Sequence, residues 1–437
     1  MERTRLALGG AALVLLGLCA AAVTAGEESA AGAVRGSAAV FGVAAPTGGA
    51  GAPGAAQAAA ELKLSSPDGP PTAADYASFR AYLHGLTPAA DNLGNNWAQG
   101  RSGEETQAMG VVYELSHDRA VLDKMIGHCD AVLSERDDLA PAPVGQHVLW
   151  TGTVDPAWPN EVTTRPIGTG GEQGDPIGHL ASCARLILKT PALAGAPVTG
   201  GDPHHYGTTY LARARTYLSQ ADTSMDRHVL ARLLDLSHGD RMYFAAADPY
   251  QGGRPVPWNQ QMMFDYAFQN LAEAHEALAD DPARVKTYDR LVKTSVDWFF
   301  GTVRRYTDAK GRPAYDWTYA PLGTDREDNS HGSLDCDGLY RAYLSGRYGI
   351  TPAMLTPLAD TFADVMTKSA GHYAGKVDGT DGAGNSAPTT YVRSGWLQTA
   401  EFRPDVYHAW AAVDFPGGTS TAVDRYSREL LLKSRRK

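Results

Sequence analysis

Residues 260–303 read QQMMFDYAFQNLAEAHEALADDPARVKTYDRLVKTSVDWFFGTV. Apolar side chains recur at the three- and four-residue spacing of a helix over 260–279 and again over 283–303. The tripeptide between them, at 280–282, is Asp-Asp-Pro, and proline suits the first turn of a following helix. This stretch therefore predicts two helices joined by a short turn, which is a helical hairpin.

Helical spacing recurs along the chain, whereas the alternating pattern of β-strands is scarce. The further predicted helices are 104–116, 120–136, 176–189, 206–221, 226–237, 333–348, 356–369, 404–413 and 423–432. Long loops rich in glycine and proline alternate with short turns; they lie at 141–174, 190–205, 306–329 and 374–390. This alternation favours stacked hairpins with the long loops on one face. We expect an all-α fold, and within it an α/α toroid, because a closed ring of hairpins needs no polar caps.

The N-terminal region has the pattern of an export signal. Arg3 and Arg5 precede an apolar run over 6–18, and Ala25 supplies a small residue for signal peptidase. Residues 26–60 are mostly alanine and glycine, a composition too poor in large apolar groups to order a chain. We expect a signal peptide at 1–25, a linker at 26–60 and a single catalytic domain at 61–437. The mature protein should be secreted, free of the membrane and monomeric.

Charge and cysteine content narrow the function further. A formal net charge of -10 argues against a general nucleic-acid binder, although a few local arginines could still attract an acidic substrate. The mature chain would keep Cys129, Cys183 and Cys336, so at most one intramolecular disulfide can form, and the sequence does not assign it. Cys336 lies between two aspartates that disfavour a thiolate, so we expect it in the core and not as a nucleophile.

The stretch 315–332 crowds aromatic rings, carboxylates, an amide and a histidine before a predicted helix. Flat aromatic rings suit the C–H faces of sugars, and His, Tyr and Glu can transfer protons at neutral pH. Two other segments, 258–261 and 92–97, combine an indole with side-chain amides, and 172–179 adds Glu, Asp and His at a loop-to-helix junction. Helix capping and core packing would also account for such residues one by one.

These motifs resemble secreted polysaccharide lyases of the α/α-toroid type, including those that cut glucuronan and alginate. The residues that carry the resemblance are Asn95-Asn96-Trp97, Trp258-Asn259-Gln260, and Tyr315 to Tyr319 followed by Glu327-Asp328-Asn329-Ser330-His331-Gly332. The resemblance implies an acidic polysaccharide substrate and β-elimination. We expect no cofactor and name no metal ligands, and the sequence does not show whether a cation is required. His204 and His205 are adjacent and point differently on a regular element, which also disfavours a metal site.

A lyase of this kind removes the proton at C5 of a uronate, next to a carboxylate whose charge must be neutralised. We expect Tyr319 as base or acid and His331 as its partner. Asn259 and Gln260 are expected to bond the uronate carboxylate. The remaining expected substrate-binding residues are Trp258, Asn96, Tyr315, Arg326, Glu327 and His179.

Two other functions remain open from the sequence. A glycoside hydrolase on the same scaffold would use two carboxylates, drawn from Asp316, Glu327, Asp328, Glu172 and Asp175. A non-catalytic sugar-binding protein would need only exposed aromatics and amides. Motifs of serine hydrolases, P-loop proteins and zinc proteases are absent from the sequence. The sequence does not name the polyuronate or distinguish endo from exo action.

Overall fold

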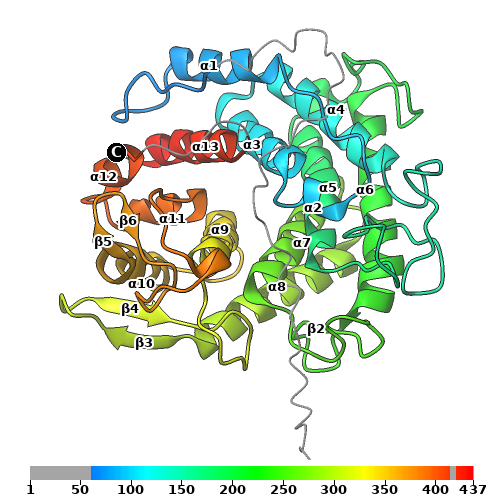
Figure 1. The fold of residues 1–437 in the computed structure, drawn as a ribbon. Coiled ribbons are helices and arrows are strands. Elements are labelled where there is room, and N and C mark those ends of the chain that lie inside the picture. The colour runs from blue at the N-terminus through cyan, green and yellow to red at the C-terminus, as the bar shows by residue number, and fades with distance from the viewer. Residues whose placement is uncertain (1–60, 414–419, 437) are drawn as a thin grey trace, which may run out of the picture. The chain divides into compact units, whose positions relative to one another are not determined.

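Helical hairpins build most of the structure (Figure 1). The computed structural model describes residues 61–413 and 420–436, so the predicted signal peptide and linker lie outside the described residues. The α-helices are Ala73–Leu83 (α1), Gly94–Trp97 (α2), Arg101–Ser116 (α3), Arg119–Ser134 (α4), Gly174–Leu188 (α5), Tyr210–Ser224 (α6), Trp258–Leu278 (α7), Pro282–Thr302 (α8), Asn329–Ser345 (α9), Pro352–Asp360 (α10), Ser394–Gln398 (α11), Tyr407–Ala411 (α12) and Ser420–Arg435 (α13). The described residues are mostly helical, which agrees with the prediction of an all-α fold.

The hairpin predicted at 260–303 forms as α7 and α8. Asp281 caps α8, because its side chain accepts a hydrogen bond from the Arg284 N–H at 2.9 Å, and Pro282 occupies the first turn. The separate helix predicted at 226–237 is wrong. Residues Met225–Leu233 continue α6 as a π-helix, and the chain then turns into a strand at Leu234–Asp235.

Short strands form three antiparallel hairpins among the described residues. They are Leu234–Asp235 (β1) with Tyr243–Phe244 (β2), Arg304–Thr307 (β3) with Pro313–Asp316 (β4), and Thr367–Ser369 (β5) with His372–Tyr373 (β6). The β3–β4 hairpin begins two residues before the long loop predicted at 306–329 and occupies its first part, directly before the candidate site.

Six helices pack against one another in a cyclic order. α3 packs on α5, α5 on α7, α7 on α9, α9 on α11, α11 on α13, and α13 on α3 (Figure 1). Neighbours in this order run parallel. On α5 and α7, for example, Gly178 lies against Tyr266 near the middle, and Arg185 bonds Asn270 further along both helices. The N-terminal ends of these helices therefore lie on one side.

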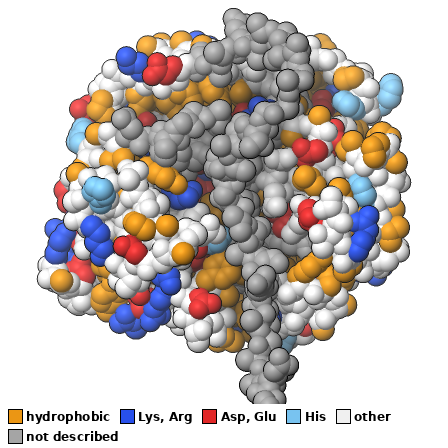
Figure 2. All heavy atoms as spheres, viewed as in Figure 1, with side chains coloured by type: hydrophobic (Ala, Val, Ile, Leu, Met, Phe, Trp, Pro, Cys, Tyr) orange, Lys and Arg blue, Asp and Glu red, His pale blue; other side chains and the backbone are white. Residues whose placement is uncertain are grey.

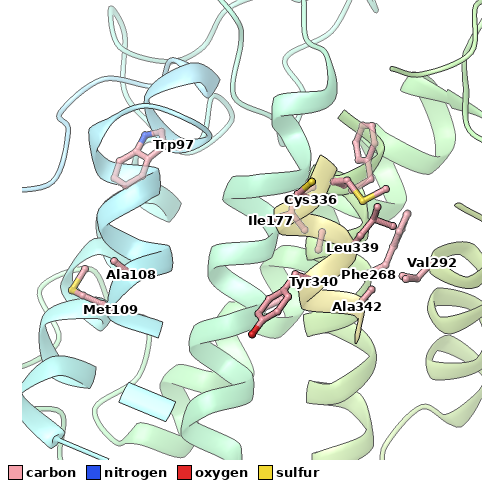
Figure 3. Close-up of a cluster of buried hydrophobic side chains, with 14 of the residues drawn as sticks. Trp97, Ala108, Met109, Ile177, Phe268, Val292, Cys336, Leu339, Tyr340 and Ala342 are labelled. Carbon is pink, nitrogen blue, oxygen red and sulfur yellow. The ribbon is translucent and has the colours of Figure 1, made fainter. Parts of the chain in front are cut away.

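Apolar side chains between the helices form the main core. Figure 3 shows Ile177 on α5, Phe268 on α7, and Cys336 and Leu339 on α9 close together. Cys336 is buried and free, as expected, while Cys129 and Cys183 form a disulfide that links α4 to α5. Within the described residues, no helix has the length and apolarity to cross a membrane.

Candidate functional site

The candidate site forms where a folded-back loop meets the starts of α7 and α9. The backbone N–H of Glu327 donates to the Trp317 carbonyl at 3.0 Å, and that of Tyr319 donates to the Asp325 carbonyl at 2.9 Å. The Trp258 N–H, at the start of α7, donates to the Tyr319 carbonyl at 3.2 Å. Because each of these bonds involves the backbone, the loop holds Tyr319 in a fixed position beside both helices.

Tyr319 and His331 lie side by side, with ring centroids 5.0 Å apart. Asp328 is the N-cap of α9, where its Oδ1 accepts from the His331 N–H at 2.9 Å. The other oxygen, Oδ2, lies 2.7 Å from His331 Nδ1. Among the described residues, the ring of His331 is hydrogen-bonded through Nδ1 and makes no hydrogen bond through Nε2. One aspartate therefore both starts the helix and fixes the orientation of the imidazole ring.

The phenol of Tyr319 is half-buried, and its pKa is raised. Burial is the largest cause, and the carboxyl groups of Glu327 and Asp328 add to it because negative charge disfavours a phenolate. The amide of Gln260 lies within hydrogen-bonding reach and acts in the opposite sense. At neutral pH the Tyr319 hydroxyl therefore carries its proton.

Glu327 and Asp335 form a buried carboxyl pair beside Tyr319 and His331. Burial raises the pKa of Glu327 well above its ordinary value and that of Asp335 to about 7, and each carboxyl interacts with the other. The Trp317 indole N–H donates to Asp335 Oδ2 at 2.8 Å, and Glu327 Oε1 accepts from the Asp328 N–H at 2.9 Å. The two remaining oxygens bond no other group, which leaves them free to share a proton.

Sequence reasoning did not assign a role to Asp335. A usable signal was present, because Asp335 follows His331 by four residues and so lies on the same face of the predicted helix.

Asn259 and Gln260 begin α7 next to Tyr319. Asn259 is buried, and its Oδ1 has no partner, as is also true of Gln260 Oε1. Gln260 packs on Gly171, in the short 3₁₀ helix Gly171–Gln173, so closely that a Cβ on Gly171 would lie 2.3 Å from the Gln260 Cβ. The two amides are thus held at the site with hydrogen-bonding capacity unused.

Two predicted sugar-binding aromatics are buried instead. Trp258 is 0% exposed and meets Trp298 and Phe299 edge to face. Tyr315 is 5% exposed and packs near Phe300. Neither ring is therefore exposed for stacking on a sugar.

Arg326 lies at the edge of the site with a 40% exposed side chain, 3.2 Å from Asp316. Arg304 contacts the same carboxylate at 2.5 Å, so Asp316 is shared by two guanidinium groups. Figure 2 shows further Lys and Arg side chains gathered over the β3–β4 hairpin, where Arg305, Lys310 and Arg312 are exposed. This basic surface begins directly beside the candidate site.

Asn96 and His179 are engaged elsewhere. The Asn96 amide donates to both oxygens of Asp91, at 2.9 and 3.0 Å. His179 is buried between the Trp97 carbonyl, 2.6 Å from Nε2, and the Tyr266 hydroxyl, 3.3 Å from Nδ1. Burial lowers the pKa of His179 to about 3, so the ring is neutral and serves packing.

Glu172 and Asp175 are buried at the start of α5, and burial raises the pKa of each to about 7. Glu172 accepts a 2.6 Å hydrogen bond from the Gly170 N–H, and Asp175 accepts one from the Gln107 amide at 3.4 Å. Both belong to α5 and its preceding loop and make no bond to the Tyr319 and His331 pair.

Glu327, Asp328 and His331 could also hold a cation, since one ligand atom from each lies within 4.8 Å of the others. Among the described residues, these three side chains form the group of His, Cys, Asp or Glu whose ligand atoms lie close enough together to hold a metal ion. In the present arrangement Asp328 Oδ2 instead bonds the His331 ring.

The glycine-rich loop predicted at 374–390 is hydrogen-bonded to the start of α9. The Asn329 N–H donates to the Gly375 carbonyl at 2.8 Å, and the Val377 N–H donates to the Glu327 carbonyl at 3.1 Å. A Cβ on Gly375 would lie 1.7 Å from the Ser386 carbonyl oxygen, so this close approach requires glycine. The base of the loop is therefore part of the site wall.

Comparison with known proteins gives one distant match. No family model matches the sequence, and no curated protein matches it. One matching solved structure is a polysaccharide lyase. The match covers 82% of this chain and 97% of that one, at 12% sequence identity and a TM-score of 0.32.

Proposed function

We propose that this protein is a polysaccharide lyase that cleaves a uronic-acid polymer by β-elimination, on an α/α toroid. The cyclic, parallel packing of α3, α5, α7, α9, α11 and α13 supports the toroid. The contact between the Tyr319 and His331 rings, at 5.0 Å, carries the proposal for the chemistry. An imidazole can accept a proton and a phenol can donate one, and the two rings lie close enough to act on neighbouring carbons of one sugar ring.

His331 is the proposed base. Its Nδ1–H donates to the carboxylate of Asp328 at 2.7 Å, which leaves the lone pair of Nε2 to accept a proton. Nε2 removes the C5 proton of the uronate. The C–H electron pair then forms the C4–C5 double bond as the C4–O4 bond breaks.

Tyr319 is the proposed acid. Its raised pKa keeps the phenol protonated at neutral pH, which suits donation to the departing O4 oxygen and not proton abstraction. The sequence alone left Tyr319 open as base or acid. Its burial beside Glu327 and Asp328 now favours the acid role.

Neutralisation of the uronate carboxylate is assigned to the amides that begin α7. The side chains of Asn259 and Gln260 each end in an NH2 group, which can donate hydrogen bonds to an anion. The amide of Gln260 lies within hydrogen-bonding reach of Tyr319. Arg326 supplies positive charge at the rim. Glu327 and Asp335 act as positioning residues, because they lie buried behind Trp317 and do not face solvent.

The carboxylate arrangement disfavours the hydrolase alternative. A glycosidase separates its two carboxyl groups by about 5–9.5 Å across the sugar. Here Glu327 and Asp335 are in direct interaction and buried, which leaves no room for a sugar between them. Asp316 is neutralised by two arginines.

The test is the ultraviolet absorbance of the unsaturated uronate while the mature protein acts on glucuronan, polymannuronate and polyguluronate, with and without EDTA. Tyr319→Phe should lower the rate by about 10²–10⁴-fold. Tyr315→Phe is the matched control, since Tyr315 is a buried tyrosine of the same stretch outside the pair, and it should keep activity. New reducing ends without absorbance would instead indicate hydrolysis, and loss of activity with EDTA would assign Glu327, Asp328 and His331 to a cation.

A further inference from the structure

A second pocket, of about 380 Å³, lies toward the other ends of the same helices. Its lining includes Gln107 of α3, Arg185 of α5, Gln269 of α7 and Arg341 of α9. Gln269 follows Asn259 by ten residues on α7, which at 1.5 Å per residue places it about 15 Å along the helix from the candidate site. The pocket is therefore separate from the Tyr319 and His331 pair.

The inner part of this pocket is polar and ordered. The Arg341 guanidinium lies 4.4 Å from the centre of the Tyr266 ring. Its Nη2 donates to Asp337 at 2.5 Å and to the Gln107 side-chain oxygen at 3.3 Å. Figure 3 shows Tyr340, another lining residue, pointing away from the apolar cluster formed by Phe268 and its neighbours.

The charges of the pocket already compensate one another. Arg185 bonds Glu114 at 2.5 Å, and Arg347 bonds Glu276 at 2.7 Å. Lys189 pairs with Glu273. Since every one of these cations has a carboxylate partner, the pocket offers no excess positive charge for a phosphate or sulfate group.

One buried donor in the lining is unused. Gln269 is 3% exposed, and its Nε2 has no hydrogen-bond partner among the described residues. The neighbouring amide of Asn270 is fully engaged, because its Oδ1 accepts from Arg185 at 2.7 Å and its Nδ2 donates to the Tyr266 carbonyl at 2.8 Å. A buried donor without an acceptor is unfavourable, and a ligand oxygen that bonded it would remove that cost.

We infer that this pocket is a second carbohydrate-binding site, which takes one or two sugar rings through their hydroxyl groups. Adjacent sugar hydroxyls each donate and accept, and amides beside paired charges supply both functions at close spacing. The volume falls in the range of about 300–1,000 Å³ that is typical of small-molecule sites. The site does not depend on the lyase chemistry and would bind sugars that the active site does not cleave.

Calorimetric titration of the mature protein with D-glucose, D-mannose, D-galactose and their uronates tests this inference. Gln269→Leu removes the unused donor at similar volume and should weaken binding about 10-fold or more. Leu344→Trp narrows the mouth, where Leu344 is 37% exposed, and should weaken binding without disturbing the core. Leu139→Trp, at a 45% exposed leucine outside the pocket, is the matched control and should bind as the wild type does.

Tyr319→Phe separates this inference from the proposed function. It should lower turnover of the polymer by about 10²–10⁴-fold and leave titration of the sugars unchanged. Binding that is lost in Tyr319→Phe but retained in Gln269→Leu and Leu344→Trp would place the sugar in the candidate active site and overturn the inference. Absence of binding by every sugar in the panel would overturn it as well.

Discussion

The Glu327 and Asp335 pair makes stability depend on pH in a direction that the structure fixes. Burial raises the pKa of Asp335 to about 7 from an ordinary value of 3.8, so the folded protein holds this proton at pH values where the unfolded chain has lost it. The stabilising effect is fully present below the unfolded pKa and is lost as the pH rises through the folded pKa. The shift corresponds to about 4 kcal/mol in total.

Asp335→Asn should remove this pH dependence. Asparagine keeps an oxygen that can accept from the Trp317 indole N–H, now 2.8 Å from Asp335 Oδ2, but it cannot ionise. Urea unfolding of wild type and variant at about pH 5 and pH 8 measures the effect. Relative to the wild type, the variant should gain roughly 2–3 kcal/mol of unfolding free energy between the two pH values.

Double mutants identify the partner that shares the proton. Glu327→Gln should give a similar change, and its combination with Asp335→Asn should be non-additive because the two carboxyls interact. Asp175→Asn removes a different buried carboxyl, on α5, with a pKa of about 7, and should add to Asp335→Asn. If wild type and Asp335→Asn show parallel pH dependences of unfolding, the carboxyl pair is ionised in the folded protein and the reasoning is wrong.

Three further changes have expected outcomes. Asp328→Asn keeps a capping oxygen for α9 but weakens the hydrogen bond to His331 Nδ1. We therefore expect kcat to fall at least 10-fold, while the unfolding free energy changes by no more than about 1 kcal/mol. A loss of stability as large as the loss of activity would contradict this expectation. Arg305→Glu places negative charge on the exposed β3–β4 surface, where Arg305 has no ion-pair partner among the described residues, and should raise KM for an acidic polymer at low salt but not at high salt. Reduction of the disulfide between Cys129 and Cys183, or replacement of both cysteines by serine, should lower the unfolding free energy by about 4 kcal/mol, because the bond closes a loop between residues 54 apart. A lower urea midpoint of unfolding would measure this loss.

The sequence predicts the helices well where apolar spacing is long and regular, as in α7 and α8, because one face of each must be buried. It misplaces the end of α6, where the apolar pattern continues but the backbone widens into a π-helix and then a strand. It also misses α11, Ser394–Gln398, which is too short to show a period. Long-range packing sets such short elements.

For the site, residue type and position before a helix were sufficient to group Tyr319 with His331. They could not show that Trp258 is buried against Trp298, since an indole before a helix suits a sugar platform and a core equally. Nor could they show that Asn96 is committed to Asp91 or that His179 bonds the Trp97 carbonyl. These outcomes depend on contacts between segments far apart in the chain.

The parallel packing of the six helices explains why separate motifs meet. A polar group that precedes one helix of the cyclic set must lie near the groups that precede its neighbours, because all these helices begin on the same side. Gly171 before α5 therefore touches Gln260 of α7, and Tyr319 before α9 bonds the Trp258 N–H. Residues that face inward two or three turns later along the same helices, such as Gln269 and Arg341, must meet at the opposite side. One arrangement thus generates two polar sites from the same helices, and a substitution in one should leave the other intact.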